Sequence, residues 1–362
     1  MKFAIACGGT GGHLFPGLAV AEVLRERGHE ILLFVSEKAV DARALRGHPD
    51  LPAVRLPSIG LPRLLSPAMF AFVSRLLTSL GQCGRAYRDA RPDAVLGMGG
   101  FTSLAPLMAA RWRGIPAFLH ESNAIPGKAN RLAARFCREV LLGFGACAPH
   151  FAGRPTQVTG TPIRRELSAH VPSQAEARHK LGLAPDRPTI LAMGGSQGAA
   201  GINLLMTKAA AALSSAKLQV IHLAGESGAG AVQSAYAAAG LPAAVLPFCD
   251  DMQDIYPAAD LAVSRSGASS LGELSWFGLP SVLIPYPYAA EDHQKLNAQI
   301  FAAAGAAEIL TEKGASGESL AGLLRSLLDS RETLSNMAAA ARSLAPRDAA
   351  ERVAAVLEGV KE

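Results

Sequence analysis

The sequence is short of the features that mark several classes of protein. Its five cysteines are scattered, odd in number and without a C-x-x-C pair, which argues against a disulfide framework or a zinc site and fits a reducing compartment. No apolar run reaches the roughly 18 uninterrupted residues of a membrane-spanning helix. The chain does not open with a basic segment followed by an apolar one, so we expect neither a spanning segment nor export.

The motifs of several common ligand sites are also missing. The dinucleotide fingerprint G-x-G-x-x-G fails near the N-terminus because its third glycine would fall on Leu14, and no G-x-x-x-x-G-K-[ST] phosphate loop occurs. The sequence has no D-x-D, no H-x-x-x-H and no cluster of histidine and cysteine, so we expect no metal and no cofactor. An anion bound by this chain must then be neutralised by helix N-termini and arginine.

The composition that remains is that of a globular protein with room for two cores. Of the 362 residues, 49% are hydrophobic and only 18% are charged, and a chain of this length fits two domains. The charge is unevenly spread, because residues 1–164 carry 20 lysines and arginines against 10 acidic residues, whereas residues 165–362 carry 15 against 20. The basic first half favours an anionic partner.

Short apolar runs alternate with helical stretches, which is the pattern of βαβ units in a parallel sheet. In the first half the expected strands are Lys2–Cys7, Glu30–Val35, Ala94–Met98, Pro116–His120, Glu139–Leu142 and Thr156–Thr159. In the second half they lie in the runs TILAMGG, LQVIHLAG, AAVLPFC, DLAVSRS, PSVLIPY and AAEIL. Residues 160–188 contain several prolines and charges and are predicted to link two doubly wound α/β domains.

The stretch GGTGGH, residues 8–13, must join the first strand to the first helix. Glycines at this place let backbone N–H groups approach an anion, and the helix that follows adds its positive end. A tight turn with positive φ explains two of the four glycines, so we predict a loop that suits a phosphate. His13 lies just past the turn, where a histidine is either a cap or a general base near neutral pH.

Two turns in the second half follow the same logic. The run GGSQGA, residues 194–199, offers the Ser196 side chain at a helix start. In RSGASSLGE, residues 265–273, small residues open a helix whose amides suit a diphosphate. Glu273 lies about one turn inside that helix, where it either accepts hydrogen bonds from both hydroxyls of a ribose or is an acidic residue favoured by the helix dipole.

Three further polar positions follow expected strands. Gln294 and Asn297, in DHQKLNA, are three residues apart on one helix face and can point at one hydroxylated ligand. Arg164, in GTPIR, can meet a phosphate. Polar helix starts and polar loops without a ligand are common, so each position also has this plainer interpretation.

Taken together, six motifs resemble, in order and spacing, those of the MurG family of glycosyltransferases. They are GGTGGH at 8–13, GMGG at 97–100, HESN at 120–123, GGSQGA at 194–199, RSGASSLGE at 265–273 and DHQKLNA at 292–298. The resemblance covers essentially the whole chain and implies a GT-B fold, in which two Rossmann-like domains face a central cleft. It also implies an inverting, β-1,4-forming transfer of N-acetylglucosamine (GlcNAc) from UDP-GlcNAc to the C4 hydroxyl of a lipid-linked N-acetylmuramyl-pentapeptide in peptidoglycan biosynthesis.

The resemblance assigns roles to the two halves and to single residues. Residues 1–164, completed by a C-terminal helix at 346–362, would receive the lipid-linked acceptor, and residues 165–345 would bind UDP-GlcNAc. From its place in the first motif, we expect His13 to be the catalytic base. The expected donor-binding residues are Arg164, Ser196, Phe248, Cys249, Arg265, Ala268, Ser269, Ser270, Glu273, Gln294 and Asn297. The expected acceptor-binding residues are Thr10, Gly11, Gly12, Gly99, Gly100 and Asn123.

One segment of the first half bears on membrane association. Between Asp50 and Asp89 there is no acidic residue, and five arginines are interspersed within and around the apolar run LPRLLSPAMFAFVSRLLTSL. This is either a buried helix with a solvated basic side or a patch that sets apolar side chains among lipid headgroups while arginines meet anionic lipid. The lipid-linked acceptor favours the patch and a peripheral place on the cytoplasmic face of the inner membrane. Other cell-wall synthesis proteins are further expected partners, and nucleic acid is not.

Two other functions stay open from the sequence alone. A UDP-GlcNAc 2-epimerase of the same fold would need no lipid acceptor and would use several carboxylates in the cleft. A regulator would bind UDP-GlcNAc without turnover. The pair of glycine-rich loops and the basic first half favour the transferase.

Overall fold

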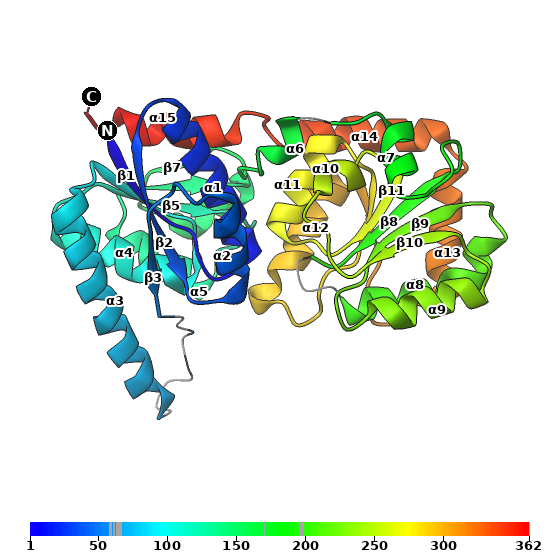
Figure 1. Ribbon diagram of the computed structural model, residues 1–362, viewed down its shortest axis with the longest axis horizontal. Helices are drawn as coiled ribbons and strands as arrows, with labels where there is room; N and C mark the ends of the chain where they lie inside the picture. Colours follow the sequence, from blue (N-terminus) through cyan, green and yellow to red (C-terminus); the bar gives the residue numbers. More distant parts are fainter. Residues whose placement is uncertain (58–59, 61, 63–66, 170, 196–198, 362) are drawn as a thin grey trace. The chain divides into compact units, whose positions relative to one another are not determined.

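Two parallel sheets organise the chain in a computed structural model that describes residues 1–57, 60, 62, 67–169, 171–195 and 199–361. Each sheet lies in its own unit, one formed by Met1–Arg164 with Pro346–Glu362 and the other by Arg165–Ala345. In the described residues of both units, helices cover the two faces of the sheet (Figure 1).

In the first unit the strand order is β3-β2-β1-β4-β5-β6-β7, and every pairing is parallel. The strands are β1 Lys2–Ala6, β2 Glu30–Ser36, β3 Ala53–Leu56, β4 Ala94–Gly97, β5 Ala117–Glu121, β6 Glu139–Leu142 and β7 Thr156–Val158. The helices are α1 Gly11–Glu26, α2 Ala39–Ala44, α3 Ala68–Ala90, α4 Gly100–Trp112, α5 Lys128–Ala133 and α15 Ala349–Glu358. The order reverses between β1 and β4, and the turns that follow these two neighbouring strands contain the first two glycine-rich motifs.

The second unit repeats this plan with the order β10-β9-β8-β11-β12-β13. Its strands are β8 Thr189–Met193, β9 Gln219–Leu223, β10 Ala243–Leu246, β11 Leu261–Ser264, β12 Ser281–Leu283 and β13 Ala307–Ile309. Its helices are α6 Glu166–Ala169, α7 Gln174–Lys180, α8 Ala200–Ser214, α9 Ala229–Ala238, α10 Met252–Ile255, α11 Ala268–Phe277, α12 His293–Ala303, α13 Gly317–Leu328 and α14 Arg331–Leu344. The reversal lies between β8 and β11, so the turns after these strands also share one edge.

Strand alternation explains how the first sheet is covered on both faces. Phe3 and Ile5 of β1 belong to the core that includes α1 and α15, whereas Ala4 and Ala6 belong to the core that includes α3 and α4. The C-terminal α15 adds Val353, Ala354 and Leu357 to the first of these cores. The chain therefore returns to the first unit after completing the second. Four of the five cysteines are buried, and all five are free.

Two expectations about the chain's course need correction. The strand β3 was not predicted, because its four residues include an arginine, alternate poorly and lie at the sheet edge. The predicted linker is wrong in part, since residues 166–169 and 174–180 form helices α6 and α7 of the second unit. Ser173 begins α7 with a capping box to Glu176, a signal that is present in the sequence as S-x-x-E.

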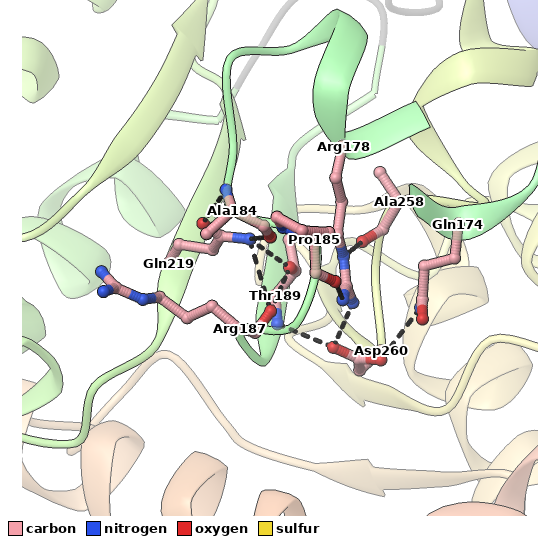
Figure 2. A network of polar contacts seen from close by, with 9 residues as sticks. All are labelled: Gln174, Arg178, Ala184, Pro185, Arg187, Thr189, Gln219, Ala258 and Asp260. Atoms are coloured by element: carbon pink, nitrogen blue, oxygen red, sulfur yellow. Dashed lines mark hydrogen bonds and ion pairs between the residues drawn. The ribbon is translucent and has the colours of Figure 1, made fainter. Parts of the chain in front are cut away.

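Arg178 anchors α7 to the sheet of the second unit, as Figure 2 shows. Its guanidinium donates to the carbonyl oxygen of Ala258 at 2.9 Å, to that of Pro185 at 2.5 Å and to Asp260 Oδ2 at 2.7 Å. The same Asp260 oxygen accepts the backbone N–H of Thr189, the first residue of β8, at 2.7 Å. This buried network lies where β8 and β11 begin, so it shapes the fold at the edge opposite the glycine-rich turns.

Candidate functional site

The first glycine-rich turn is held by a buried carboxylate that the sequence did not single out. Asp41 Oδ2 accepts the backbone N–H of Gly9 at 2.9 Å and both the N–H and the hydroxyl of Ser36 at 2.6 Å. Lys38 Nζ donates to the Gly9 carbonyl at 2.8 Å. A Cβ at Gly8 would lie 2.3 Å from the Ser36 nitrogen, so close packing requires glycine there. No local sequence signal marks Asp41, because it comes from the next βα unit.

The second turn, after β4, is held in a similar way by side chains from β5 and α5. Gly99 and Gly100 have φ of 104° and 70°, values that favour glycine. The Gly100 N–H donates to Asn130 Oδ1 at 3.0 Å, and Asn130 Nδ2 donates to Glu121 Oε2 at 2.7 Å. Glu121 Oε1 accepts both the backbone N–H and the side-chain amide of Asn123, at 2.9 and 3.0 Å. Burial raises the pKa of Glu121, although these hydrogen bonds oppose the rise.

His13 connects the two turns. Its ring packs on the second turn so closely that Cβ atoms at Gly99 and Gly100 would lie 3.2 and 3.1 Å from ring carbons. On the side of the first turn, His13 Nδ1 lies 3.1 Å from Thr10 Oγ1, within hydrogen-bond distance. Burial, with a smaller effect of Lys38, lowers the pKa of His13 to about 4, and Asp41 partly opposes this shift. The imidazole is therefore neutral near pH 7 and able to accept a proton.

The remaining predicted site residues of the first unit are Thr10, Gly11 and Gly12 of the acceptor site and Arg164 of the donor site. Thr10 is exposed and precedes α1, which begins at Gly11, and Gly12 lies in the first turn of that helix. Arg164, at the end of this part of the chain, places its guanidinium over the Phe15 ring at 4.5 Å. The structure thus brings His13, Thr10, Gly99 and Gly100 together.

In the second unit the predicted diphosphate cradle is the start of α11. Ala268, Ser269 and Ser270 are its first three residues and follow Gly267. Backbone N–H groups in the first turn of a helix have no carbonyl partner within the helix, so they point toward an anion placed at its end. Gly195, after β8, has φ of 87°. Ser196, the predicted partner from that turn, lies outside the described residues, and α8 begins at Ala200.

Glu273 lies in the second turn of α11 and is 8% exposed. Its Oε2 accepts the hydroxyl of buried Tyr256 at 2.5 Å. Side chains of a helix lean toward its N-terminus, so the carboxylate leans toward the end where the amides of Ala268–Ser270 lie. Glu273 belongs to a recognisable motif, whereas Tyr256 belongs to none and was not predicted.

Three predicted donor residues brace the turns at this edge. Asn297 is wholly buried, and its Nδ2 donates to the Ser266 carbonyl at 3.0 Å. Gln294 Oε1 accepts the backbone N–H of Tyr286 at 2.8 Å. Arg265 donates to the Ile284 carbonyl at 3.0 Å. These contacts hold the segment before α11 and the segment after β12 in place, which is a supporting role that the sequence did not reveal.

Phe248 and Cys249 follow β10 and are partly exposed. Burial raises the pKa of the Cys249 thiol, with neighbouring aspartates adding to the rise. The thiol is therefore not activated as a nucleophile, which fits the predicted role of this segment as a contact surface for a base.

Helix α3 presents two different apolar faces. Leu76 and Leu80 pack on the core of the first unit, and the Phe72 ring makes an edge contact with Phe101 of α4 at 6.1 Å. Phe70, Val73 and Leu77 point outward, with 84%, 45% and 62% of their surface exposed. Figure 1 shows the start of α3 extending beyond the rest of the first unit. Among the described residues, no helix has the length and apolar character to cross a bilayer.

Comparison with known proteins gives consistent matches along the whole chain. Residues 3–142 match the glycosyltransferase family 28 N-terminal domain and residues 189–353 its C-terminal domain. The UDP-N-acetylglucosamine--N-acetylmuramyl-(pentapeptide) pyrophosphoryl-undecaprenol N-acetylglucosamine transferase of Geobacter sulfurreducens is 39% identical, covering 98% of this chain and 97% of that protein. The protein of the same name from Halorhodospira halophila is 40% identical, covering 99% and 98%.

Solved structures include one that is similar to this chain in sequence and fold and one that is similar in fold alone. The crystal structure of Acinetobacter baumannii MurG superimposes with a TM-score of 0.76 at 30% identity and covers 99% of both chains. A putative UDP-N-acetylglucosamine 2-epimerase from Listeria monocytogenes gives a TM-score of 0.71, covering 100% of this chain and 96% of that one, but only 16% identity. The second similarity shows the fold alone.

Proposed function

The chain belongs to the MurG family within glycosyltransferase family 28, and on this basis we propose that it moves GlcNAc from UDP-GlcNAc to a lipid-linked N-acetylmuramyl-pentapeptide. Its fold is the two-domain GT-B fold of that family. The alternative of a 2-epimerase has only the shared fold in its favour, because the epimerase structure is 16% identical whereas the curated transferases reach 40%.

The contact of His13 with both glycine-rich turns carries the mechanism that we propose. The acceptor sugar binds on the turns that contain Thr10, Gly99 and Gly100, and His13 accepts the proton of the 4-hydroxyl as this oxygen attacks the anomeric carbon of GlcNAc. A pKa of about 4 leaves the imidazole neutral near pH 7, in its accepting form, but makes it a weak base before the acceptor binds. The acceptor's diphosphate would raise that pKa toward neutrality and make His13 a stronger base.

We assign the binding of UDP-GlcNAc to the second unit. The N–H groups at the start of α11 bind the diphosphate of UDP-GlcNAc, and Glu273 accepts hydrogen bonds from the ribose hydroxyls. Phe248 and Cys249 contact the uracil, and Gln294 contacts the sugar. As UDP leaves, negative charge grows on its diphosphate, and Arg164 together with the helix ends stabilises that charge without a metal ion.

We also propose that α3 seats the enzyme on the cytoplasmic face of the inner membrane. Three apolar side chains on one exposed face, Phe70, Val73 and Leu77, support this, since a solvated helix without a partner would not need them. Trp112, at the end of the adjacent α4, is 66% exposed and lies between two arginines in sequence. It adds an exposed aromatic side chain of the kind that inserts among lipid headgroups. Such a position would bring the protein to an acceptor that cannot leave the bilayer.

The test is release of UDP from UDP-GlcNAc in EDTA, with and without a lipid-linked N-acetylmuramyl-pentapeptide diphosphate. We expect release only when the acceptor is present, with a disaccharide as the second product. Interconversion of the free nucleotide sugar would favour an epimerase instead, and tight binding without turnover would indicate a regulator. Loss of activity in EDTA that added Mg²⁺ restores would contradict the metal-free mechanism.

A further inference from the structure

A buried hydrogen bond in the second unit joins a tyrosine that carries no motif to the carboxylate proposed to recognise the donor. The Tyr256 hydroxyl donates to Glu273 Oε2 at 2.5 Å. Tyr256 is 2% exposed and Glu273 is 8% exposed, so this bond is shielded from water. Hydrogen bonds to an ionised carboxylate are short and strong, and this one has the length expected for an O–H donor.

Contacts other than its bond to Glu273 hold Tyr256 in place. Tyr256 follows α10, and its backbone N–H donates to the Met252 carbonyl at 3.1 Å. Its ring stacks on Phe277, the last residue of α11, with 5.0 Å between ring centroids and 24° between the planes. Two residues further on, the carbonyl of Ala258 is held by Arg178, as Figure 2 shows. The hydroxyl therefore stands at a fixed place beside α11.

Glu273, in contrast, has a long side chain whose carboxylate gains a defined orientation only from its partners. A carboxylate offers about four acceptor positions, so one carboxylate can bind a tyrosine hydroxyl and both hydroxyls of a ribose at the same time. Fixing the group in advance reduces the ordering cost of binding. Tyr256 is thus suited to orient the Glu273 carboxylate, although it is buried and belongs to no motif.

We infer that Tyr256 is a positioning residue for the donor: its hydroxyl holds the Glu273 carboxylate in the orientation that recognises the ribose hydroxyls of UDP-GlcNAc. This inference rests on the proposed role of Glu273 and adds a residue that does not touch the substrate itself. It places part of the specificity for a ribonucleotide in the segment between α10 and β11.

The test compares two ligands on Tyr256→Phe, a change that keeps the ring stacked on Phe277 and removes the hydroxyl alone. Calorimetry measures the Kd of UDP and of 2′,3′-dideoxyuridine diphosphate, which lacks both ribose hydroxyls. We expect the Kd of UDP to rise about tenfold, in line with the loss of one hydrogen bond to a charged group, and that of the dideoxy ligand to stay unchanged. In turnover, KM for UDP-GlcNAc should rise with kcat nearly constant.

Tyr236→Phe is the matched control. Tyr236 is a wholly buried tyrosine of the same unit whose hydroxyl lies 2.7 Å from His222 Nδ1. Its replacement removes a buried hydroxyl of equal size without touching Glu273. The ratio of the two dissociation constants should therefore equal that of the unmodified protein, even if the variant is less stable.

Glu273→Ala separates the inference from the function on which it rests. If this variant keeps the preference for UDP over the dideoxy ligand, the ribose role of Glu273 is wrong and the inference fails with it. If Glu273→Ala loses the preference while Tyr256→Phe retains it, only the role of Tyr256 is overturned. An equal rise of both dissociation constants in Tyr256→Phe also overturns the role of Tyr256, because a purely structural role would weaken the binding of both ligands alike. Adding Tyr256→Phe to Glu273→Ala should produce no further loss of preference.

Discussion

Asp41 Oδ2 accepts the backbone N–H of Gly9 at 2.9 Å, which joins the start of α2 to the turn after β1. The bond matters because Gly9 has a φ of 109° and offers no side chain by which the turn can be anchored. The wholly buried carboxylate takes over that task and also accepts two hydrogen bonds from Ser36. Proposed acceptor recognition therefore depends on a residue 32 positions away in sequence.

Replacing Asp41 should impair both stability and turnover. In Asp41→Ala the N–H groups of Gly9 and Ser36 lose their acceptor, so we expect a loss of about 1–3 kcal/mol in the free energy of unfolding. The loosened turn should also lower kcat/KM for the acceptor at least tenfold. Urea unfolding and steady-state kinetics measure the two effects. The exposed Asp50→Ala is the control, and equal behaviour of the two variants would contradict the assignment.

Replacing His13 should lower turnover without weakening the donor site. We expect His13→Ala to reduce kcat by about 10²–10⁴-fold, the usual contribution of a general base, and to leave the Kd of UDP unchanged. The exposed His150→Ala serves as the control. A reduction below about tenfold would mean that another group accepts the proton.

The stability of the fold should fall as the solution becomes acidic. Burial lowers the pKa of both His120 and His222 to about 4, from 6.5, and both are wholly buried. The unfolded chain therefore binds more protons between these two values, so stability is complete above about pH 6.5 and is lost as the pH falls toward 4. Each histidine can account for about 3 kcal/mol by this linkage.

Urea unfolding of the unmodified protein and of His222→Gln at about pH 7 and pH 5 tests this linkage. The variant should lose less stability than the unmodified protein over the same interval, because the residue at position 222 no longer titrates. An equal loss in the two proteins would show that His222 does not contribute.

Two ion pairs of the second unit should differ sharply in their effect on stability. Arg178 is 4% exposed in its side chain and holds Asp260 at 2.7 Å, whereas Lys180 is 52% exposed and holds Asp254 at 2.8 Å. Arg178→Met removes the cationic partner of Asp260 and the donor to two carbonyls, and it should cost about 3–5 kcal/mol. Lys180→Met should cost less than about 1 kcal/mol. Chemical unfolding of both variants gives the comparison, and similar losses would refute it.

The exposed face of α3 should determine binding to lipid. The double variant Phe70→Ser, Leu77→Ser removes two apolar side chains that are 84% and 62% exposed. We expect its affinity for vesicles containing anionic phospholipid to fall at least tenfold, with no change in UDP binding. Leu204→Ser, at a leucine of α8 that is 55% exposed, is the control in cosedimentation assays. Unchanged vesicle binding by the double variant would exclude this face as the docking surface.

Local pattern was enough to predict the sheets, with one exception. Five-residue apolar runs such as TILAM at 189–193 are buried on both faces, and each expected strand of the second half is present among the described residues. The exception is the edge strand β3, which was missed because it is partly solvated and has no continuous apolar run. The prediction of a linker was partly wrong because prolines and charged residues also occur in exposed parts of a folded domain. Arg178 of this segment is even buried, where it anchors α7.

The sequence by itself determined the βαβ alternation, the glycine-rich turns, the start of α11 and, through the resemblance, the family. These features are local, since a strand end, a glycine and a helix start within ten residues suffice to define them. Only the tertiary structure decided which side chains hold the turns. Asp41, Glu121 and Tyr256 come from other βα units, and a partner brought in by sheet topology leaves no trace in the local pattern. The same holds for α3, whose apolar residues divide between core and exposed face according to what packs beside them.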